Sequence, residues 1–167
     1  MTAADILAAA RAKGWRIATA ESCTGGMVAV SLTDLAGSSD VFDRGCVTYS
    51  NAAKIEMLGV AAQTLTDFGA VSPQVALEMA AGALTRSTAD LAVSITGIAG
   101  PGGSEFKPEG RVCFGLAQRD RPALSETVDF GALGRAAVRV RRTMLPETKR
   151  SRGVLMGQAP WIRAREG

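Results

Sequence analysis

The chain has 167 residues, 47% of them hydrophobic, which is enough for one domain with its own core. It has no histidine and three cysteines without CxxC spacing, which excludes histidine-based triads and disfavours disulfide frameworks and zinc sites. The net charge of +3 is uneven, because nine of the nineteen Lys and Arg residues follow position 134. A basic tail on a mildly acidic body is weak support for nucleic-acid binding, which we do not expect.

The sequence carries no membrane or secretion signal. No run of about 18 apolar residues is present, as a membrane-spanning helix would need. The N-terminus also lacks a basic stretch followed by an apolar core. We therefore expect a cytoplasmic protein without a membrane span.

The first elements predict a helix, a strand and a second helix. Thr2 as N-cap and Gly14 after the last turn indicate a helix over residues 3–13. Alternation over residues 15–20 predicts a strand, and the apolar residues 27–35 predict a helix.

A glycine-rich turn joins this strand to the second helix, and its sequence is Glu21-Ser22-Cys23-Thr24-Gly25-Gly26. Backbone N–H groups at such a helix start suit a phosphate or a carboxylate. A tight strand-to-helix connection, with Glu21 and Ser22 as an N-cap pair, explains the same residues equally well.

The stretch over residues 36–54 combines the groups that nucleophilic attack on a carbonyl needs. It opens with a turn that contains Ser38 and Ser39, continues as a strand over residues 45–50 with Tyr49, and enters a helix that carries Lys54. A core tyrosine and an exposed lysine on an amphipathic helix are the alternative explanations.

The second half predicts the remainder of an α/β sheet. Residues 63–67 predict a short helix, and Ser72 and Pro73 begin a longer one. The apolar run 91–95 predicts a buried strand, followed by a long glycine-rich loop over residues 96–110. That loop is neither a Walker A loop nor a GxGxxG turn, and we expect it to contact a ligand.

Two further strands, over residues 111–118 and 124–130, predict a hairpin at the end of the sheet. The expected fold class is therefore α/β, a single three-layer α/β/α domain with a mostly parallel, mixed sheet. We expect the domain to span residues 1–145 and a basic, poorly ordered tail to span residues 146–167.

Four segments, taken together and in this order, resemble the CinA C-terminal domain family. Their sequences are Ala20-Glu21-Ser22-Cys23-Thr24-Gly25-Gly26, Gly45-Cys46-Val47-Thr48-Tyr49-Ser50-Asn51-Ala52-Ala53-Lys54, Gly69-Ala70-Val71-Ser72 and Ser94-Ile95-Thr96-Gly97-Ile98-Ala99-Gly100-Pro101. The resemblance covers residues 3–139. The family's GDR segment is Leu133-Gly134-Arg135 here, and its apolar closing helix is replaced after Arg139 by Arg-rich sequence.

The resemblance implies an amidohydrolase that converts nicotinamide mononucleotide to nicotinate mononucleotide and ammonia in pyridine nucleotide salvage. It implies a homodimer, and neither a metal nor a cofactor. It places the catalytic groups on Ser39, Tyr49 and Lys54. The substrate-binding residues that it implies are Glu21, Ser22, Thr24, Gly25, Gly26, Thr96, Gly97, Gly100 and Arg135.

Without histidine, the serine needs another base, and a lysine serves when burial or a neighbouring cation lowers its pKa. We expect Lys54 to take the Ser39 proton, directly or through Tyr49, with Arg44 as the candidate cation. Ser22 and Cys23 are rival nucleophiles.

Further contacts with the substrate follow from the glycine-rich segments. The oxyanion donors would come from Ser38 and Ser39 or from the loop over residues 97–103. The phosphate would sit on the Thr24-Gly25-Gly26 helix start or on Arg135. The alternative to an enzyme is a non-catalytic, nucleotide-binding or competence/damage-inducible interaction module.

Overall fold

A five-stranded sheet forms the centre of the molecule. The computed structural model describes residues 2–104 and 106–140. The strands follow the order β2 (Phe42–Val47), β1 (Ile17–Glu21), β3 (Leu91–Gly97), β4 (Arg111–Gln118) and β5 (Leu124–Asp129). The β2, β1 and β3 strands are parallel neighbours, while β4 pairs antiparallel with both β3 and β5. Four strands therefore run one way and β4 runs against them, so the expected mostly parallel, mixed sheet is confirmed.

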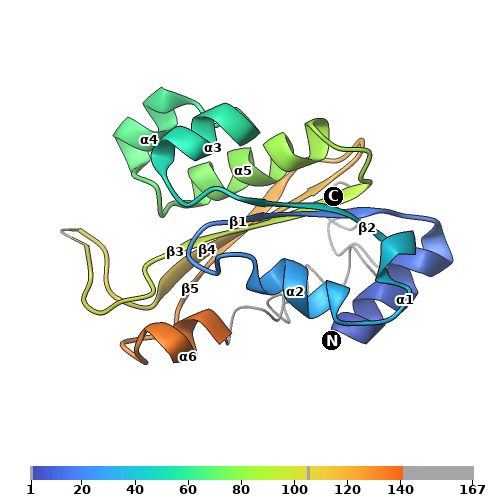
Figure 1. Ribbon diagram of the computed structural model, residues 1–167. Coiled ribbons are helices and arrows are strands. Elements are labelled where there is room, and N and C mark those ends of the chain that lie inside the picture. The colour runs from blue at the N-terminus through green and yellow to red at the C-terminus, as the bar shows by residue number, and fades with distance from the viewer. Residues whose placement is uncertain (1, 105, 141–167) are drawn as a thin grey trace, which may run out of the picture.

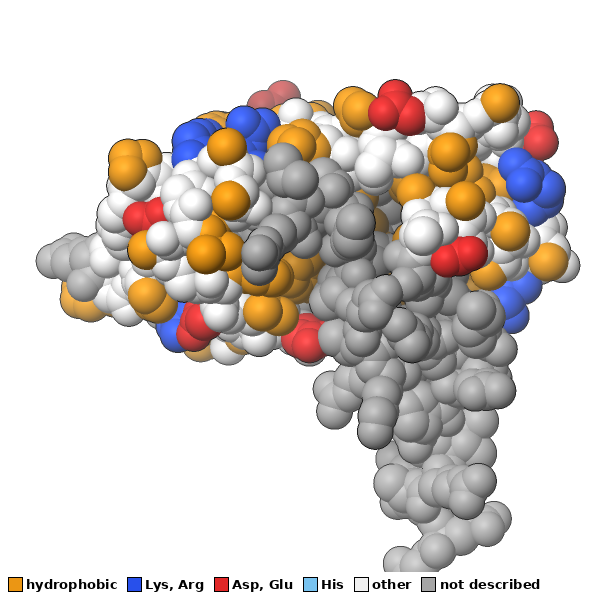
Figure 2. Space-filling model, turned by 90° about the horizontal axis from the view of Figure 1, so that it is seen from below, with side chains coloured by type: hydrophobic (Ala, Val, Ile, Leu, Met, Phe, Trp, Pro, Cys, Tyr) orange, Lys and Arg blue, Asp and Glu red, His pale blue; other side chains and the backbone are white. Residues whose placement is uncertain are grey.

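Helices cover both faces of this sheet (Figure 1). One face carries α3 (Asn51–Leu58), α4 (Ala62–Phe68) and α5 (Pro73–Thr85), and the other carries α1 (Ala3–Lys13), α2 (Met27–Thr33) and α6 (Arg135–Val140). Seen from the side of α1, α2 and α6, the surface bears hydrophobic side chains interspersed with a few charged ones (Figure 2). The arrangement is the expected three-layer α/β/α domain.

The alternation of side chains along β1 explains the two cores. Ala18 and Ala20 face α3, α4 and α5 and belong to the cluster that contains Leu58 and Met79. Ile17 belongs to the opposite cluster, with residues of α1 and α2. Successive residues of a strand point to opposite faces, so Ser22, which follows this strand, is directed to the α3 and α5 side.

The predicted first helix is confirmed with its caps. Thr2 Oγ1 accepts from Asp5 N, and Thr2 N donates to the Asp5 carboxylate, which forms a capping box. Gly14 ends the helix in the left-handed conformation at φ 65°.

The boundaries of β2 and α2 differ from the prediction. The β2 strand covers Phe42–Val47 instead of 45–50, because Phe42 packs into the core while Thr48 turns towards α3. The α2 helix ends at Thr33 instead of 35. The end of the predicted domain at 145 and the predicted tail lie outside the described residues, and no described helix is long and apolar enough to cross a membrane.

Candidate active site

The buried amine of Lys54 lies against the hydroxyl of Ser22. Ser50 caps α3, its Oγ accepting from Ala53 N at 3.1 Å, and so places Lys54 in the first turns of the helix. Lys54 Nζ donates to Ser22 Oγ at 3.1 Å and to the Thr48 carbonyl at 2.8 Å. Lys54 is only 1% exposed and Ser22 9%. The two side chains form a water-shielded serine–lysine pair at the carboxyl ends of β1 and β2.

The surroundings of Lys54 favour the neutral amine. Burial lowers the pKa of Lys54 from its ordinary value of 10.5, and the neighbouring Cys23 thiol opposes this effect. Within the described part of the chain no carboxylate pairs with the ammonium form, since the partners of the amine there are a hydroxyl and a carbonyl. A lysine whose pKa is lowered in this way can act as a general base.

Tyr49 and Arg135 contact each other at the same carboxyl ends of the strands, where Tyr49 is exposed to solvent. Arg135 of α6 donates from Nη2 to Tyr49 Oη at 2.5 Å and from Nη1 to the Gly100 carbonyl at 3.3 Å. Tyr49 is 58% exposed, so it is not the core residue that the alternative explanation required. The structure therefore brings together three of the predicted site residues from elements far apart in the sequence.

Glu21 occupies the start of α2. Its carboxylate accepts from Gly26 N at 3.1 Å, Val28 N at 3.0 Å and Ala29 N at 2.8 Å, and its side chain is buried. These N–H groups are the ones that a helix start offers to an anion. The substrate phosphate is predicted either on this helix start or on Arg135, and Arg135 is the better placed of the two because a carboxylate of the chain already fills the helix start.

The remaining residues of this turn shape the edge of the site. Gly25 and Gly26 have φ values of 62° and 98°, a region that side chains rarely adopt. The Thr24 carbonyl accepts from Arg139 Nη2 at 3.1 Å. The hydroxyls of Thr24 and Thr48 are buried and have no hydrogen-bond partner among the described residues.

Thr96 and Gly97 end β3 beside this turn. Thr96 is buried, and its hydroxyl donates to the Ala70 carbonyl at 2.7 Å, so it holds the turn between α4 and α5 against the sheet. The loop after Gly97 bends back at Glu109, which accepts from Gly102 N at 2.6 Å. This loop lies at the same sheet edge as Ser22, which makes its backbone N–H groups the better placed of the two predicted sources of oxyanion donors.

Ser39 lies at the amino ends of the parallel strands, whereas Ser22 and Lys54 lie at their carboxyl ends. It belongs to the short 3-10 helix η1 (Ser38–Asp40), which precedes β2, whereas Lys54 follows β2. The six residues of β2 separate the two, at about 3.3 Å per residue, or about 20 Å. Within one chain Lys54 cannot take the Ser39 proton, and the predicted pairing of these two residues is wrong.

Arg44 is not the cation that perturbs Lys54. It is exposed, pairs with Asp43 at 2.6 Å and donates to the Arg86 carbonyl at 2.8 Å. Burial lowers the pKa of Lys54 instead. Of the two predicted causes of a lowered Lys54 pKa, burial therefore applies and a cation at Arg44 does not.

Sequence reasoning assigned no role to Thr48 or Arg139. Thr48 was part of the quoted motif, but only the fold shows that its carbonyl holds the lysine amine. Arg139 lies one helical turn after Arg135, a spacing that puts both side chains on the same side of α6. Within the part of the chain that the structure describes, no three His, Cys, Asp or Glu side chains gather as a metal site would need.

Comparisons with known proteins agree on one family. The sequence model of the CinA C-terminal domain matches residues 1–145. The chain is 56% identical over 137 residues to nicotinamide-nucleotide amidohydrolase PncC of Enterobacter agglomerans, which covers 81% of this chain and 83% of that protein. It is 60% identical over 110 residues to PncC of Escherichia coli K12, covering 65% of this chain and 67% of that one.

A solved structure gives the same result. The competence/damage inducible protein CihA from Agrobacterium tumefaciens superposes with a TM-score of 0.77 at 50% sequence identity. The superposition covers 83% of this chain and 89% of that chain. The chain therefore belongs to the CinA C-terminal domain family.

Proposed function

We propose that this chain is an amidohydrolase that converts nicotinamide mononucleotide to nicotinate mononucleotide and ammonia. The observation that carries the proposal is the buried Lys54 amine 3.1 Å from the Ser22 hydroxyl. In a chain without histidine, such a pair supplies both nucleophile and base for attack on an amide. The names of the two relatives above support the choice of the nicotinamide nucleotide as substrate.

In the proposed mechanism Ser22 is the nucleophile and neutral Lys54 is the general base. Lys54 takes the Ser22 proton as Oγ attacks the carboxamide carbon, and a tetrahedral intermediate forms. Lys54 then gives the proton to the leaving nitrogen, and ammonia departs from a Ser22 acyl-enzyme. Water, deprotonated by Lys54, attacks the ester, and this proton passes from Lys54 to Ser22 as the carboxylic acid leaves. The acid then loses its remaining proton to solvent and becomes the carboxylate product.

Two further groups are assigned to the substrate. Backbone N–H groups of the loop after Gly97 would stabilise the oxyanion, since this loop lies at the same edge as Ser22. Arg135 would bind the phosphate, with Tyr49 holding its guanidinium through the bond from Nη2. Thr96 is assigned a positioning role, because its hydroxyl is already used by the Ala70 carbonyl.

The test is ammonia release from nicotinamide mononucleotide by the purified protein, with nicotinamide riboside as a second substrate that lacks the phosphate. We expect release from the mononucleotide and formation of nicotinate mononucleotide in equal amount. A folded protein that binds the mononucleotide but releases no ammonia would contradict the proposal and support the alternative, a non-catalytic nucleotide-binding module.

We also propose that the protein acts as a homodimer in the cytoplasm, in pyridine nucleotide salvage. The β2 strand is at the edge of the sheet, and Val47 on it and Val30 on α2 are 45% and 54% exposed. Exposed apolar side chains beside an open strand edge favour burial against a second copy. Light scattering would measure the mass, and a monomer at working concentration would contradict the homodimer.

A further inference from the structure

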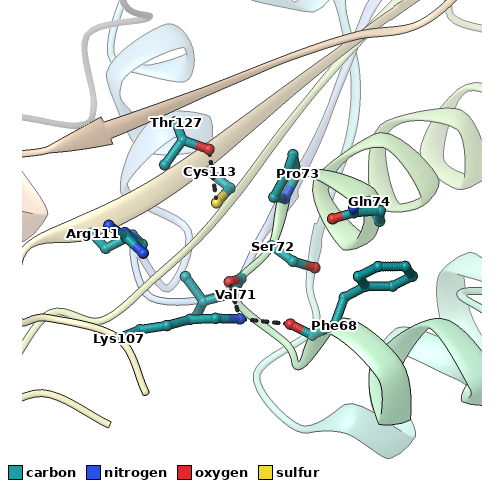
Figure 3. Close-up of a pocket in the computed structure, with 9 residues that line it drawn as sticks. All are labelled: Phe68, Val71, Ser72, Pro73, Gln74, Lys107, Arg111, Cys113 and Thr127. Atoms are coloured by element: carbon teal, nitrogen blue, oxygen red, sulfur yellow. Dashed lines mark hydrogen bonds between the residues drawn. The ribbon is translucent and has the colours of Figure 1, made fainter.

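A concavity lies beyond the turn between α4 and α5. It has a volume of about 300 Å³ and is lined by this turn, by the end of the long loop before β4, and by β4 and β5 (Figure 3). This volume is at the lower end of the range for small-molecule sites in proteins. The lining includes none of the residues assigned above to the reaction.

The strand register relates this pocket to Ser22. Ser22 N donates to the carbonyl of Ile95, the residue before Thr96 on β3. Thr96 is paired with Cys113 on β4, and Cys113 is paired with Thr127 on β5. Cys113 and Thr127 line the pocket, and their side chains are within hydrogen-bonding distance at 3.4 Å. The pocket therefore begins two strands from Ser22, at about 4.8 Å per strand, or about 10 Å.

The turn between α4 and α5 separates the pocket from the serine–lysine pair. Its Ala70 carbonyl accepts from Thr96 on the side of Ser22, whereas Val71 lines the pocket on the other side. Lys107 lines the pocket and donates from Nζ to the Phe68 carbonyl at 2.6 Å and to the Val71 carbonyl at 2.7 Å. The pocket is thus a separate site that shares one wall with the serine–lysine pair.

Two cationic side chains give the pocket hydrogen-bond donors that no described residue uses. A lysine ammonium has three N–H donors, and the two carbonyls above use only two of those on Lys107. Arg111 donates from Nε and Nη2 to the Asp129 carboxylate, both at 2.8 Å, which fixes the guanidinium and leaves Nη1 for another acceptor. Among the described residues, no Asp or Glu side chain lines the pocket.

The other side of the pocket is apolar. Phe68, Val71 and Pro73 line it, and Phe68 is 45% exposed although it is a large hydrophobic residue. Figure 3 shows the Phe68 ring and Pro73 on the side of the helices, across from Arg111. A flat apolar body would cover these side chains while an acceptor group reaches the two cations.

We propose that this pocket binds a small aromatic carboxylate, with the carboxylate on Lys107 and Arg111 and the ring against Phe68 and Pro73. Charge-assisted hydrogen bonds from Lys107 Nζ and Arg111 Nη1 supply the specificity for the anion. The ligand is either the carboxylate product of the proposed reaction or an unrelated aromatic acid, since both present the same groups.

The test measures binding of benzoate and of benzamide, which has nearly the same shape without the charge, by chemical-shift changes in the amide spectrum of the full chain. We expect saturable benzoate binding with shifts at residues 68–74 and 107–113, and at least about tenfold weaker binding of benzamide. Equal binding of the two probes, shifts elsewhere, or no saturable binding of benzoate would overturn the proposal.

Variants locate the anion contact. Lys107→Met and Arg111→Gln should each weaken benzoate binding at least about tenfold, and the second variant leaves the Lys107 bonds to the turn intact. The matched control is Arg121→Gln, an exposed arginine outside the pocket, which should leave binding unchanged. Unchanged binding in both pocket variants would contradict the assignment.

Competition separates the two sources of ligand. Nicotinate mononucleotide that displaces benzoate identifies the product as the ligand, and its failure to do so identifies an unrelated aromatic acid. Because these measurements read binding directly, their outcome does not depend on whether the chain releases ammonia.

Discussion

Two serine turns at opposite edges of the sheet look alike in sequence and differ in their surroundings. Ser22 follows β1, is nearly buried, and accepts a hydrogen bond from Lys54. Ser39 precedes β2 in an exposed 3-10 turn, next to Asp40, which pairs with Arg11 at 3.8 Å. A glycine within three residues of a serine therefore indicates a turn, while a buried amine identifies the serine that can be deprotonated.

The difference between the edges follows from the parallel strands. Because β1, β2 and β3 run in one direction, the segments after them meet at the carboxyl edge, and the segment before β2 cannot. The described contacts at the amino edge include the bond from Arg11 to the Gly37 carbonyl at 2.9 Å, which stabilises the fold.

Replacing the two serines in parallel has the largest expected effect. Ser22→Ala should lower kcat for ammonia release at least about 10³-fold, because it removes the proposed nucleophile. Ser39→Ala should leave kcat within about threefold, as expected for an exposed turn residue away from the reacting atoms. Loss of activity in Ser39→Ala with retention in Ser22→Ala would reverse the comparison.

Replacing Lys54 tests whether its buried amine is what makes Ser22 reactive. Lys54→Met should lower kcat by about 10² to 10⁴-fold, since it removes the general base but keeps the apolar stem. The wild-type rate should rise with pH through a pKa below 10.5, because only the neutral amine accepts the proton. A rate that falls with rising pH through this range would contradict that role.

The same lysine makes a signed prediction about stability. Folded Lys54 has a lowered pKa, so between this pKa and 10.5 the folded state binds fewer protons than the unfolded state. The free energy of unfolding of the wild type, relative to Lys54→Met, should therefore rise with pH across this window and level off above it. Urea denaturation of both proteins over the same pH series measures the difference, and a constant difference would contradict burial of the amine as the cause.

Replacing Arg135 tests the proposed contact with the substrate phosphate. Arg135→Ala should raise KM for nicotinamide mononucleotide about tenfold, since a charge-assisted contact to the phosphate is lost. The same variant should leave KM for nicotinamide riboside unchanged. Arg121→Ala, which removes an exposed arginine elsewhere, is the matched control, and equal effects on both substrates would exclude the phosphate contact.

Glu21 gives the smallest expected change in activity. Glu21→Gln should lower the free energy of unfolding by about 1–3 kcal/mol, because one amide oxygen cannot accept from Gly26, Val28 and Ala29 together. KM should stay the same, measured beside thermal unfolding. A raised KM with unchanged stability would instead make Glu21 a substrate contact.

Local signals in the sequence predicted most of the elements, though not all their ends. The helix after Thr2 begins at the predicted N-cap, since capping depends on residues within one turn. The start of β2 was misplaced by three residues, because Phe42 is held by packing against the first helix and not by alternation. The loop that contains Gly100 follows β3 at the carboxyl edge of the sheet, as predicted, but its contact with Arg135 was not predicted.

The sequence by itself determined the class of fold, the absence of histidine and the presence of a lysine one turn inside α3. These properties depend on composition and short-range pattern, which a linear chain displays directly. The tertiary structure decided which serine this lysine contacts, that Glu21 fills the start of α2, and that burial lowers the lysine pKa. Such properties depend on which strand ends lie close together in space and on how deeply that region is buried. The spacing of residues along the chain specifies neither.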